Sequence, residues 1–300
     1  MYQHDHHSHD TSGSKALRGA LLLTLTFAAV EFVVGWWGGS LALMADAGHM
    51  LTDSTALGLA AVAAWIATRP ADSAHSWGHG RAEIIAALIN GLAMVVLVGV
   101  IVYNAIDRFQ NPVEIRGAAV LLVAAIGLLI NLAVLRVLHG GQGNINVQGA
   151  RLHVLGDLLG SIAALASGAV ILTTGWNPID PILSLLICAL ILIAAIRLLR
   201  TALGVIMERV PGTVDLEQVR QSLTEIAGVV EIHDLHIWQV SGDRIALSAH
   251  VVLDDLQEWP EMLARCNAML LEDFAIDHAT LQPEPAGAEG CRHPDPRCAG

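Results

Sequence analysis

Charge is scarce in this chain of 300 residues, and basic charge is scarcest. Only 15% of the residues are charged, with 16 Lys and Arg against 28 Asp and Glu, whereas an average soluble chain has about 25% charged residues. So few cations cannot build the basic face that binds nucleic acid, nor a polybasic segment that binds lipid headgroups. Four cysteines in the whole chain are too few for the disulfide framework of a small secreted domain.

The acidic charge is concentrated in the last third of the chain. Residues 1–206 hold 10 basic and 11 acidic residues, so this part has a net charge of only −1. Residues 207–300 hold 6 basic and 17 acidic residues, which accounts for −11 of the total of −12. A nearly neutral part and a strongly acidic part indicate two regions in different surroundings.

The nearly neutral part consists mostly of long apolar runs. Each run is long enough to cross the hydrocarbon core of a bilayer, which takes about 20 helical residues. The runs do not alternate apolar and polar residues as barrel strands do, so they predict helices. A large soluble helical bundle is the alternative, but these runs have no polar faces to expose to water. We expect a six-helix transmembrane domain over residues 15–206, with helices near residues 16–37, 41–67, 82–106, 117–138, 149–173 and 179–203.

Basic residues near the ends of these runs predict the orientation. Nine of them lie on the side shared by both chain ends, whereas the opposite side has only Arg108 and Arg116. Because basic residues are enriched in cytoplasmic loops, we expect both termini in the cytoplasm. The polar first fifteen residues and the length of the first apolar run argue against a cleaved signal sequence.

Residues 207–285 have the pattern of a small α+β domain. Two segments alternate apolar and polar residues, as half-buried strands do, and the turn Ser241-Gly242-Asp243 separates them. A domain of this size folds alone only marginally, so dimerisation is expected to help it. The predicted order is αββαβ, with helices at Asp215–Ala227 and Glu258–Phe274 and strands at Val229–Val240, Arg244–Leu253 and Ala275–Gln282.

Both ends of the chain are predicted to be tails. Residues 1–14 contain four histidines between positions 4 and 9, a composition typical of metal-binding tracts. An expression tag is the alternative, but interrupting Asp and Ser residues argue against it. Residues 286–300 are rich in Pro, Gly and charge, which predicts disorder.

The second and fifth apolar runs contain ionisable residues at matched spacing. A charged side chain at mid-membrane costs about 2.5–3.5 kcal/mol, so several of them require a compensating interaction. Asp46, His49 and Asp53 share one face of the second helix, and His153 and Asp157 share one face of the fifth. Both helices contain the pattern H-x-L-x-D. Apposing these faces brings two imidazoles and two carboxylates together.

This set of side chains suits a four-coordinate metal ion such as zinc. Zinc accepts imidazole nitrogen and carboxylate oxygen, and two carboxylates neutralise its charge. Monovalent copper prefers sulfur, and magnesium and calcium prefer an all-oxygen shell, so the set disfavours these ions. The alternative is two separate His–Asp pairs that tie helices together, although the repeated spacing favours a metal or proton site. Asp46 either orients a ligand from outside the coordination shell or hydrogen-bonds a neighbouring helix.

Other polar residues within the apolar runs are expected to form interhelical hydrogen bonds. These residues are Glu31, Asn90, Asn104 and Asn131.

A second cluster of possible metal ligands lies in the connector between the second and third helices. Asp72, His75 and His79 supply one oxygen and two nitrogen ligands within eight residues. The alternative is a solvated loop whose histidines bind nothing. In the acidic domain, His233, His236 and His250 lie on or beside the two adjacent predicted strands.

Three motifs of this chain resemble the cation diffusion facilitator family, and in particular its bacterial zinc-efflux branch. They are Ser40–Asp53 (SLALMADAGHMLTD), Leu152–Ser161 (LHVLGDLLGS) and His233–Trp238 (HDLHIW). The resemblance covers about residues 15–285. It implies a homodimer in the bacterial inner membrane that exchanges cytoplasmic zinc for protons, with a ferredoxin-like cytoplasmic domain. It also implies a secondary transporter, not an enzyme, that uses no organic cofactor.

The resemblance assigns roles to the candidate residues. It implies that the transport site consists of His49, Asp53, His153 and Asp157. It also supports the interpretation of the loop cluster as a second metal site. In the cytoplasmic domain it implies metal binding by the positions of His233, His250 and Glu284. This chain has Gln282 where some relatives have a further His ligand, which argues against a full binuclear site; His236 either substitutes for that ligand or only packs. It further implies an ion pair between Arg81 and Glu208.

Two other functions remain as alternatives. The same scaffold can transport cadmium, cobalt, nickel, manganese or iron, which this ligand set separates only partly from zinc. A membrane metal sensor or a metal-dependent hydrolase is an alternative of a different class. A hydrolase needs an open coordination position and a separate general base, whereas the two His–Asp pairs already offer four ligands.

Overall fold

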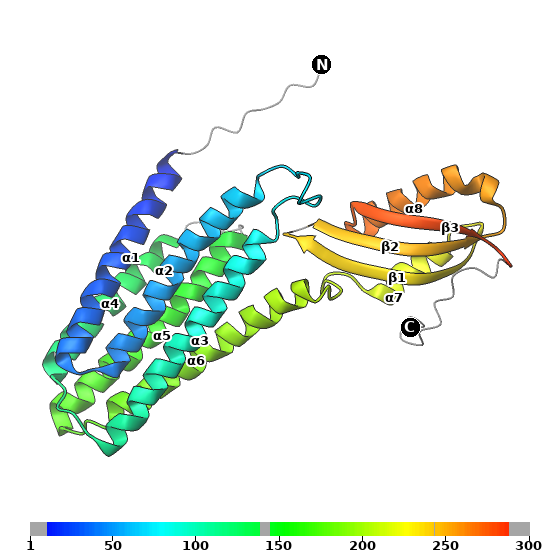
Figure 1. Cartoon of the computed structure of the whole chain (residues 1–300). Coiled ribbons are helices and arrows are strands. Elements are labelled where there is room, and N and C mark those ends of the chain that lie inside the picture. Colours follow the sequence, from blue (N-terminus) through cyan, green and yellow to red (C-terminus); the bar gives the residue numbers. More distant parts are fainter. Residues whose placement is uncertain (1–10, 139–144, 243, 288–300) are drawn as a thin grey trace. The chain divides into compact units, whose positions relative to one another are not determined.

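The computed structural model describes the backbone of residues 11–138, 145–242 and 244–287, and the side chains of residues 24–136, 155–242 and 244–287. The four histidines of the N-terminal tail and residues 288–300 lie outside these ranges. The described chain forms two compact units. The first unit comprises the residues up to 59 together with residues 89–198, and the second comprises residues 60–88 together with the residues from 199 onward. The long helices of Figure 1 are α1 (Thr11–Gly38), α2 (Leu41–Ala67), α3 (Ala82–Gln110), α4 (Gly117–Leu138), α5 (Ile145–Thr174) and α6 (Ile179–Ile206).

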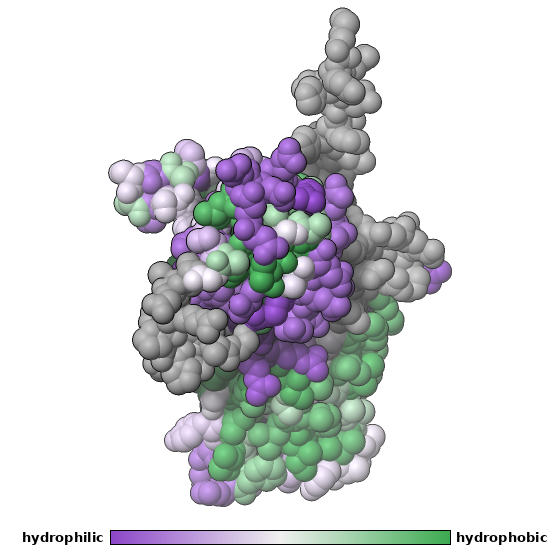
Figure 2. Space-filling model, turned by 90° about the vertical axis from the view of Figure 1, so that its right-hand side faces the viewer, coloured by the Kyte–Doolittle hydropathy of each residue, from purple (hydrophilic) through white to green (hydrophobic). Residues whose placement is uncertain are grey.

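All six predicted apolar runs are helical. Within the described residues, five helices are long and apolar enough to cross a membrane, and α1 contributes a shorter apolar stretch at Thr24–Gly38. Large apolar side chains such as Val96, Leu129 and Leu186 are exposed on the outside of these helices. Figure 2 shows the hydrophobic residues gathered over the helices, whereas hydrophilic residues dominate the surface of the α+β domain. Such an apolar exterior suits lipid rather than water.

Glycines allow α4 and α5 to pack closely. A Cβ at Gly168 of α5 would lie 2.7 Å from the backbone nitrogen of Leu121 in α4. A Cβ at Gly117 of α4 would lie 3.0 Å from the backbone nitrogen of Leu172. Small residues at such crossings let two backbones approach each other, which is how membrane helices gain packing energy in the absence of a hydrophobic driving force.

A fully buried carboxylate at the beginning of α6 connects four helices. Asp180 accepts hydrogen bonds from the Ser40 hydroxyl and the Leu41 backbone N–H, both at 2.6 Å, and from the Ser167 hydroxyl at 3.1 Å. The guanidinium of Arg108 in α3 lies 3.5 Å from the same carboxylate. Asp180 therefore holds the first turn of α2, the helix that contains His49 and Asp53, against α3, α5 and α6.

Replacement of Asp180 is predicted to destabilise the bundle. Asp180→Ala leaves the charge of Arg108 and two buried hydroxyls without their acceptor, which costs about 3–5 kcal/mol when a buried ion pair loses one partner. We expect a clearly lower thermal unfolding temperature in detergent. Asp107→Ala on α3 is the control, because Asp107 is exposed and its carboxylate accepts a hydrogen bond from the nearby Asn111 amide. Equal unfolding temperatures for the two variants would contradict the anchoring role.

The second unit contains the predicted αββαβ domain. Its elements are α7 (Leu216–Thr224), β1 (Val229–Ser241), β2 (Arg244–Leu253), the short η1 (Leu256–Glu258), α8 (Trp259–Phe274) and β3 (His278–Pro285). The sheet order is β1-β2-β3, with β1 antiparallel and β3 parallel to β2. The Asp215 side chain caps α7 by accepting from the Glu217 and Gln218 N–H groups. Buried side chains of both helices and the strands, including Val219, Leu247 and Leu270, form one core.

The third strand begins later than the sequence predicts. It was expected at Ala275–Gln282, but β3 extends from His278 to Pro285. Ala275 ends α8 in the left-handed conformation with φ of 55°, and the buried Ile276 then packs into the core before pairing with β2 starts. The later register places Glu284 inside the strand and not beyond its end.

Candidate metal centre

Three of the four predicted transport-site residues converge between α2 and α5. His49 Nδ1 lies 3.4 Å from Asp53 Oδ2, and His49 Nε2 lies 3.9 Å from Asp157 Oδ1. One ligand atom from each of the three residues falls within 4.8 Å of the others. Because all three side chains are largely withdrawn from solvent, at 16%, 12% and 8% exposure, the arrangement can replace the hydration shell of a small divalent cation.

The fourth predicted ligand, His153, lies on α5 one turn before Asp157. Its side chain lies outside the described residues, so its part in the cluster remains a prediction from helical spacing.

Asp46 is buried beside this cluster and hydrogen-bonds α5. The Ser161 hydroxyl donates to Asp46 Oδ2 at 3.4 Å, and the Asn131 amide of α4 donates to Ser161 at 3.1 Å. This is one of the two alternatives that the sequence leaves open for Asp46; an effect on a bound metal remains a prediction. Asn131 thus forms an interhelical bond, as expected. Asn104 does not, because its amide donates to the Val100 carbonyl within α3.

A cavity of about 250 Å³ adjoins the site. Asp46, His49 and Asp53 line it from α2, and Gly156 and Gly160 line it from α5. Apolar side chains of α3 and α6 form the remaining wall. Polar groups at one place in an otherwise apolar cavity are typical of a specific binding site.

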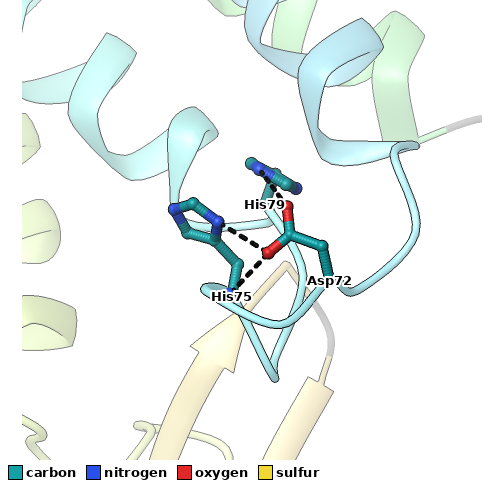
Figure 3. A group of neighbouring side chains, drawn as sticks. All are labelled: Asp72, His75 and His79. Atoms are coloured by element: carbon teal, nitrogen blue, oxygen red, sulfur yellow. Dashed lines mark hydrogen bonds and ion pairs between the residues drawn. The ribbon is translucent and has the colours of Figure 1, made fainter.

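The loop between α2 and α3 brings its three predicted ligands together. Figure 3 shows the Asp72 carboxylate beside the rings of both His75 and His79, 3.1 Å and 3.9 Å from their nitrogens. Hydrogen bonds from the backbone N–H and ring of His75, and from the Ala74 N–H, lower the pKa of the Asp72 carboxyl. The carboxylate therefore keeps its charge at a lower pH than an unperturbed aspartate does. The cluster lies at the surface, where water competes for its ligands.

Nearby, Arg81 lies 3.6 Å from Glu208 as expected.

A third cluster lies on the sheet of the α+β domain. Glu284 Oε2 lies 3.0 Å from His233 Nε2, and Glu284 Oε1 lies 2.7 Å from His250 Nδ1. The two histidines are paired across β1 and β2. One carboxylate therefore contacts two imidazoles, as the sequence predicts for these three positions.

His236 does not join this three-residue cluster. The β1–β2 register shifts between His233 and His236, and Asp234, between them, has a positive φ of 49°, so the regular alternation of side chains is interrupted. His236 lines a neighbouring cavity with Asp234 and Gln282. Asp234 was not among the site residues predicted from the sequence. Its carboxylate lies 3.7 Å from the other ring nitrogen of His233. Its position directly after His233 in the chain could have indicated this contact.

Two family models match consecutive parts of the chain. The cation efflux transmembrane domain matches residues 17–207, and the cytoplasmic domain of cation efflux proteins matches residues 211–286. The chain belongs to the cation diffusion facilitator family of cation efflux proteins. This cation efflux protein is accordingly a multi-pass membrane transporter and not an enzyme, which confirms the fold and class expected from the motifs.

Relatives cover almost the full length of this cation efflux protein. It is 42% identical over 287 residues to the zinc transporter ZitB of Yersinia pestis, covering 95% of this chain and 91% of the relative. It is 41% identical over 288 residues to the metal cation efflux system protein CzcD of Cupriavidus metallidurans, with 94% and 91% coverage. A cadmium, cobalt and zinc/H(+)-K(+) antiporter of Bacillus velezensis is 36% identical over 289 residues, with 94% and 92% coverage.

Two glycines of α5 provide a matched test of the geometry at Asp46. A Cβ at Gly160 would overlap Asp46 Oδ1 and lie 2.9 Å from its Cγ, whereas in the described part of the chain no atom lies within 4 Å of a Cβ at Gly156. Overpacking costs about 1–3 kcal/mol, so Gly160→Ala is expected to weaken zinc binding about tenfold, measured by calorimetry. Gly156→Ala, one turn earlier and lining the same cavity, is the control. Similar affinities for both variants would show that Asp46 does not influence the site.

Proposed function

We propose that this cation efflux protein is a zinc/proton antiporter that exports cytoplasmic zinc across the bacterial inner membrane. Its transport site consists of His49, Asp53, His153 and Asp157. The observation that carries the proposal is the convergence of His49 and Asp53 of α2 with Asp157 of α5 in a largely buried position next to a cavity. A cation efflux protein needs its ligands within the membrane-spanning helices, and this cluster meets that requirement.

The chemistry of the ligands supports zinc as the substrate. Imidazole nitrogen and carboxylate oxygen are zinc ligands, and two carboxylates compensate the charge of a divalent ion. The names of the relatives from Yersinia pestis and Bacillus velezensis include zinc. Cadmium and cobalt, which the second name also includes, are the alternative substrates.

Proton exchange follows from the same ligands. Histidine and aspartate bind metal only when deprotonated, so protons and zinc compete for the same atoms. Zinc taken up from the cytoplasm displaces protons, and protons arriving from the opposite side displace zinc after the bundle has exposed the site there. Imidazole suits this exchange because its pKa lies close to physiological pH. The antiporter name of the Bacillus velezensis relative supports this step.

The other two clusters are proposed as metal sites with supporting roles. Asp72, His75 and His79 form an exposed site in the loop between α2 and α3. His233, His250 and Glu284 form a site in the cytoplasmic domain, where bound metal stabilises a homodimer and so biases the membrane domain.

Both termini are proposed to lie in the cytoplasm, from the distribution of basic residues. A metal sensor would not need ligands matched on two spanning helices.

The transport site is tested by Asp157→Asn, which keeps the size of the side chain and removes its charge. In liposomes with an internal zinc indicator and an imposed pH gradient, we expect the zinc flux to fall at least about 100-fold, since even outer-shell partners are worth about 10–100-fold in metal affinity. Asp107→Asn on the exposed face of α3 is the control. An undiminished zinc flux in Asp157→Asn would show that the transport site is misplaced. A zinc flux of the wild type that does not depend on the pH gradient would exclude antiport.

The metal choice is tested by His49→Asp. This change replaces an imidazole by a harder anionic ligand, so we expect the preference to shift from zinc toward manganese. Competition among zinc, cadmium, cobalt and manganese for transport by the same liposomes measures the shift. An unchanged order of preference would contradict the role of His49 in selecting the ion.

The cytoplasmic site is tested by His250→Asn. The purified chain is expected to bind about one zinc equivalent less and to lose zinc-dependent thermal stabilisation of this domain. His278→Asn, at the beginning of β3 and outside the cluster, is the control. Equal zinc stoichiometry of both variants would argue against metal binding at His250.

A further inference from the structure

Glu31 of α1 is a buried acidic side chain outside the proposed coordination shell. It has 0% solvent exposure. The side chain occupies space that Gly127 of α4 leaves free, since a Cβ at Gly127 would lie 3.4 Å from Glu31 Oε1 and 2.9 Å from the ring of Phe27. In the described part of the chain, neither carboxyl oxygen has a hydrogen-bond partner. The expected interhelical hydrogen bond of Glu31 is therefore not formed there.

The groups that act on Glu31 from the neighbouring helices are acidic or neutral. Asp46 of α2 and Asp157 of α5 interact with it electrostatically, both repulsively. From α4, the amide of Asn131 is engaged by Ser161. Within the described residues, no ion pair with a basic side chain compensates Glu31. An ionised carboxylate at this position costs several kcal/mol of desolvation and adds like-charge repulsion, whereas the neutral acid avoids both.

A bound divalent cation shifts this balance. When the metal is held by Asp53 and Asp157, its two positive charges offset their two negative charges, so the repulsion that Asp157 exerts on an ionised Glu31 is removed. Electrostatic interactions are weakly screened in such an apolar layer. The protonation of Glu31 thus depends on the occupancy of the metal site without Glu31 being a ligand.

We propose that Glu31 is a proton-binding site coupled electrostatically to the metal site. It holds a proton on its carboxyl group while the metal site is empty. When a divalent cation binds, the O–H bond breaks, the carboxylate remains and the proton leaves to solvent; the reverse occurs on metal release. This inference rests on the proposed antiport, and it differs from competition at the ligands because Glu31 is not one of the four proposed ligands.

The test counts the protons released for each zinc ion bound. Titration calorimetry of the full-length protein in buffers of different ionisation enthalpy gives this number for the wild type, for Glu31→Gln and for Glu31→Leu. Glutamine imitates the neutral acid in shape, and leucine suits the same apolar surroundings if the glutamine variant folds poorly. Glu114→Gln, in the exposed connector between α3 and α4, is the matched control.

Both Glu31 variants are expected to bind zinc and to release about one proton fewer per zinc than the wild type and the control. Release equal to that of the wild type would overturn the inference and leave the antiport intact. A folded variant that binds no zinc would also overturn it, because Glu31 would then belong to the coordination itself. If the wild type releases no protons, the proposed antiport fails first.

Discussion

The cost of placing charge in an apolar membrane layer governs how this protein is built. The buried acidic residues of the helical unit differ in how far their charge is compensated. Asp180 is neutralised by Arg108 and by hydroxyl and backbone donors, so it serves as a fixed anchor. Asp53 and Asp157 face His49, a partner that can exchange a proton or share a metal ion. The type of compensation separates residues that hold the bundle from residues that can change state.

This difference explains why one bundle can be both stable and active. The anchor at Asp180 involves several donors at the beginning of α2 and α6, whereas the cluster around His49 adjoins a cavity. Glu31 and Asp46 are further buried acidic residues of the same unit, and both lie outside the proposed coordination shell.

The α+β domain meets a different constraint because water surrounds it. Its acidic charge is solvated, and its core is formed in the ordinary way by apolar faces of two helices and a sheet. Glu284 and its two histidines lie partly exposed on that sheet. The three residues of the loop cluster between α2 and α3 are also at least partly exposed. The side chains at these positions can therefore be reached from the solvent.

The sequence by itself determined the membrane helices, the αββαβ order and the pairing of His49 with Asp53, because hydropathy and helical spacing are local properties. Asp157, which lies in a family motif, and Glu284, which the family resemblance implied, were also identifiable. Only the tertiary structure decided which partners distant residues meet. Asp180 meets Ser40, Glu31 packs beside Gly127, and His236 lines a cavity that it shares with His250 after a shift in strand register. Compensation of a buried charge depends on side chains from several helices, so it cannot be predicted from the spacing of residues along one helix.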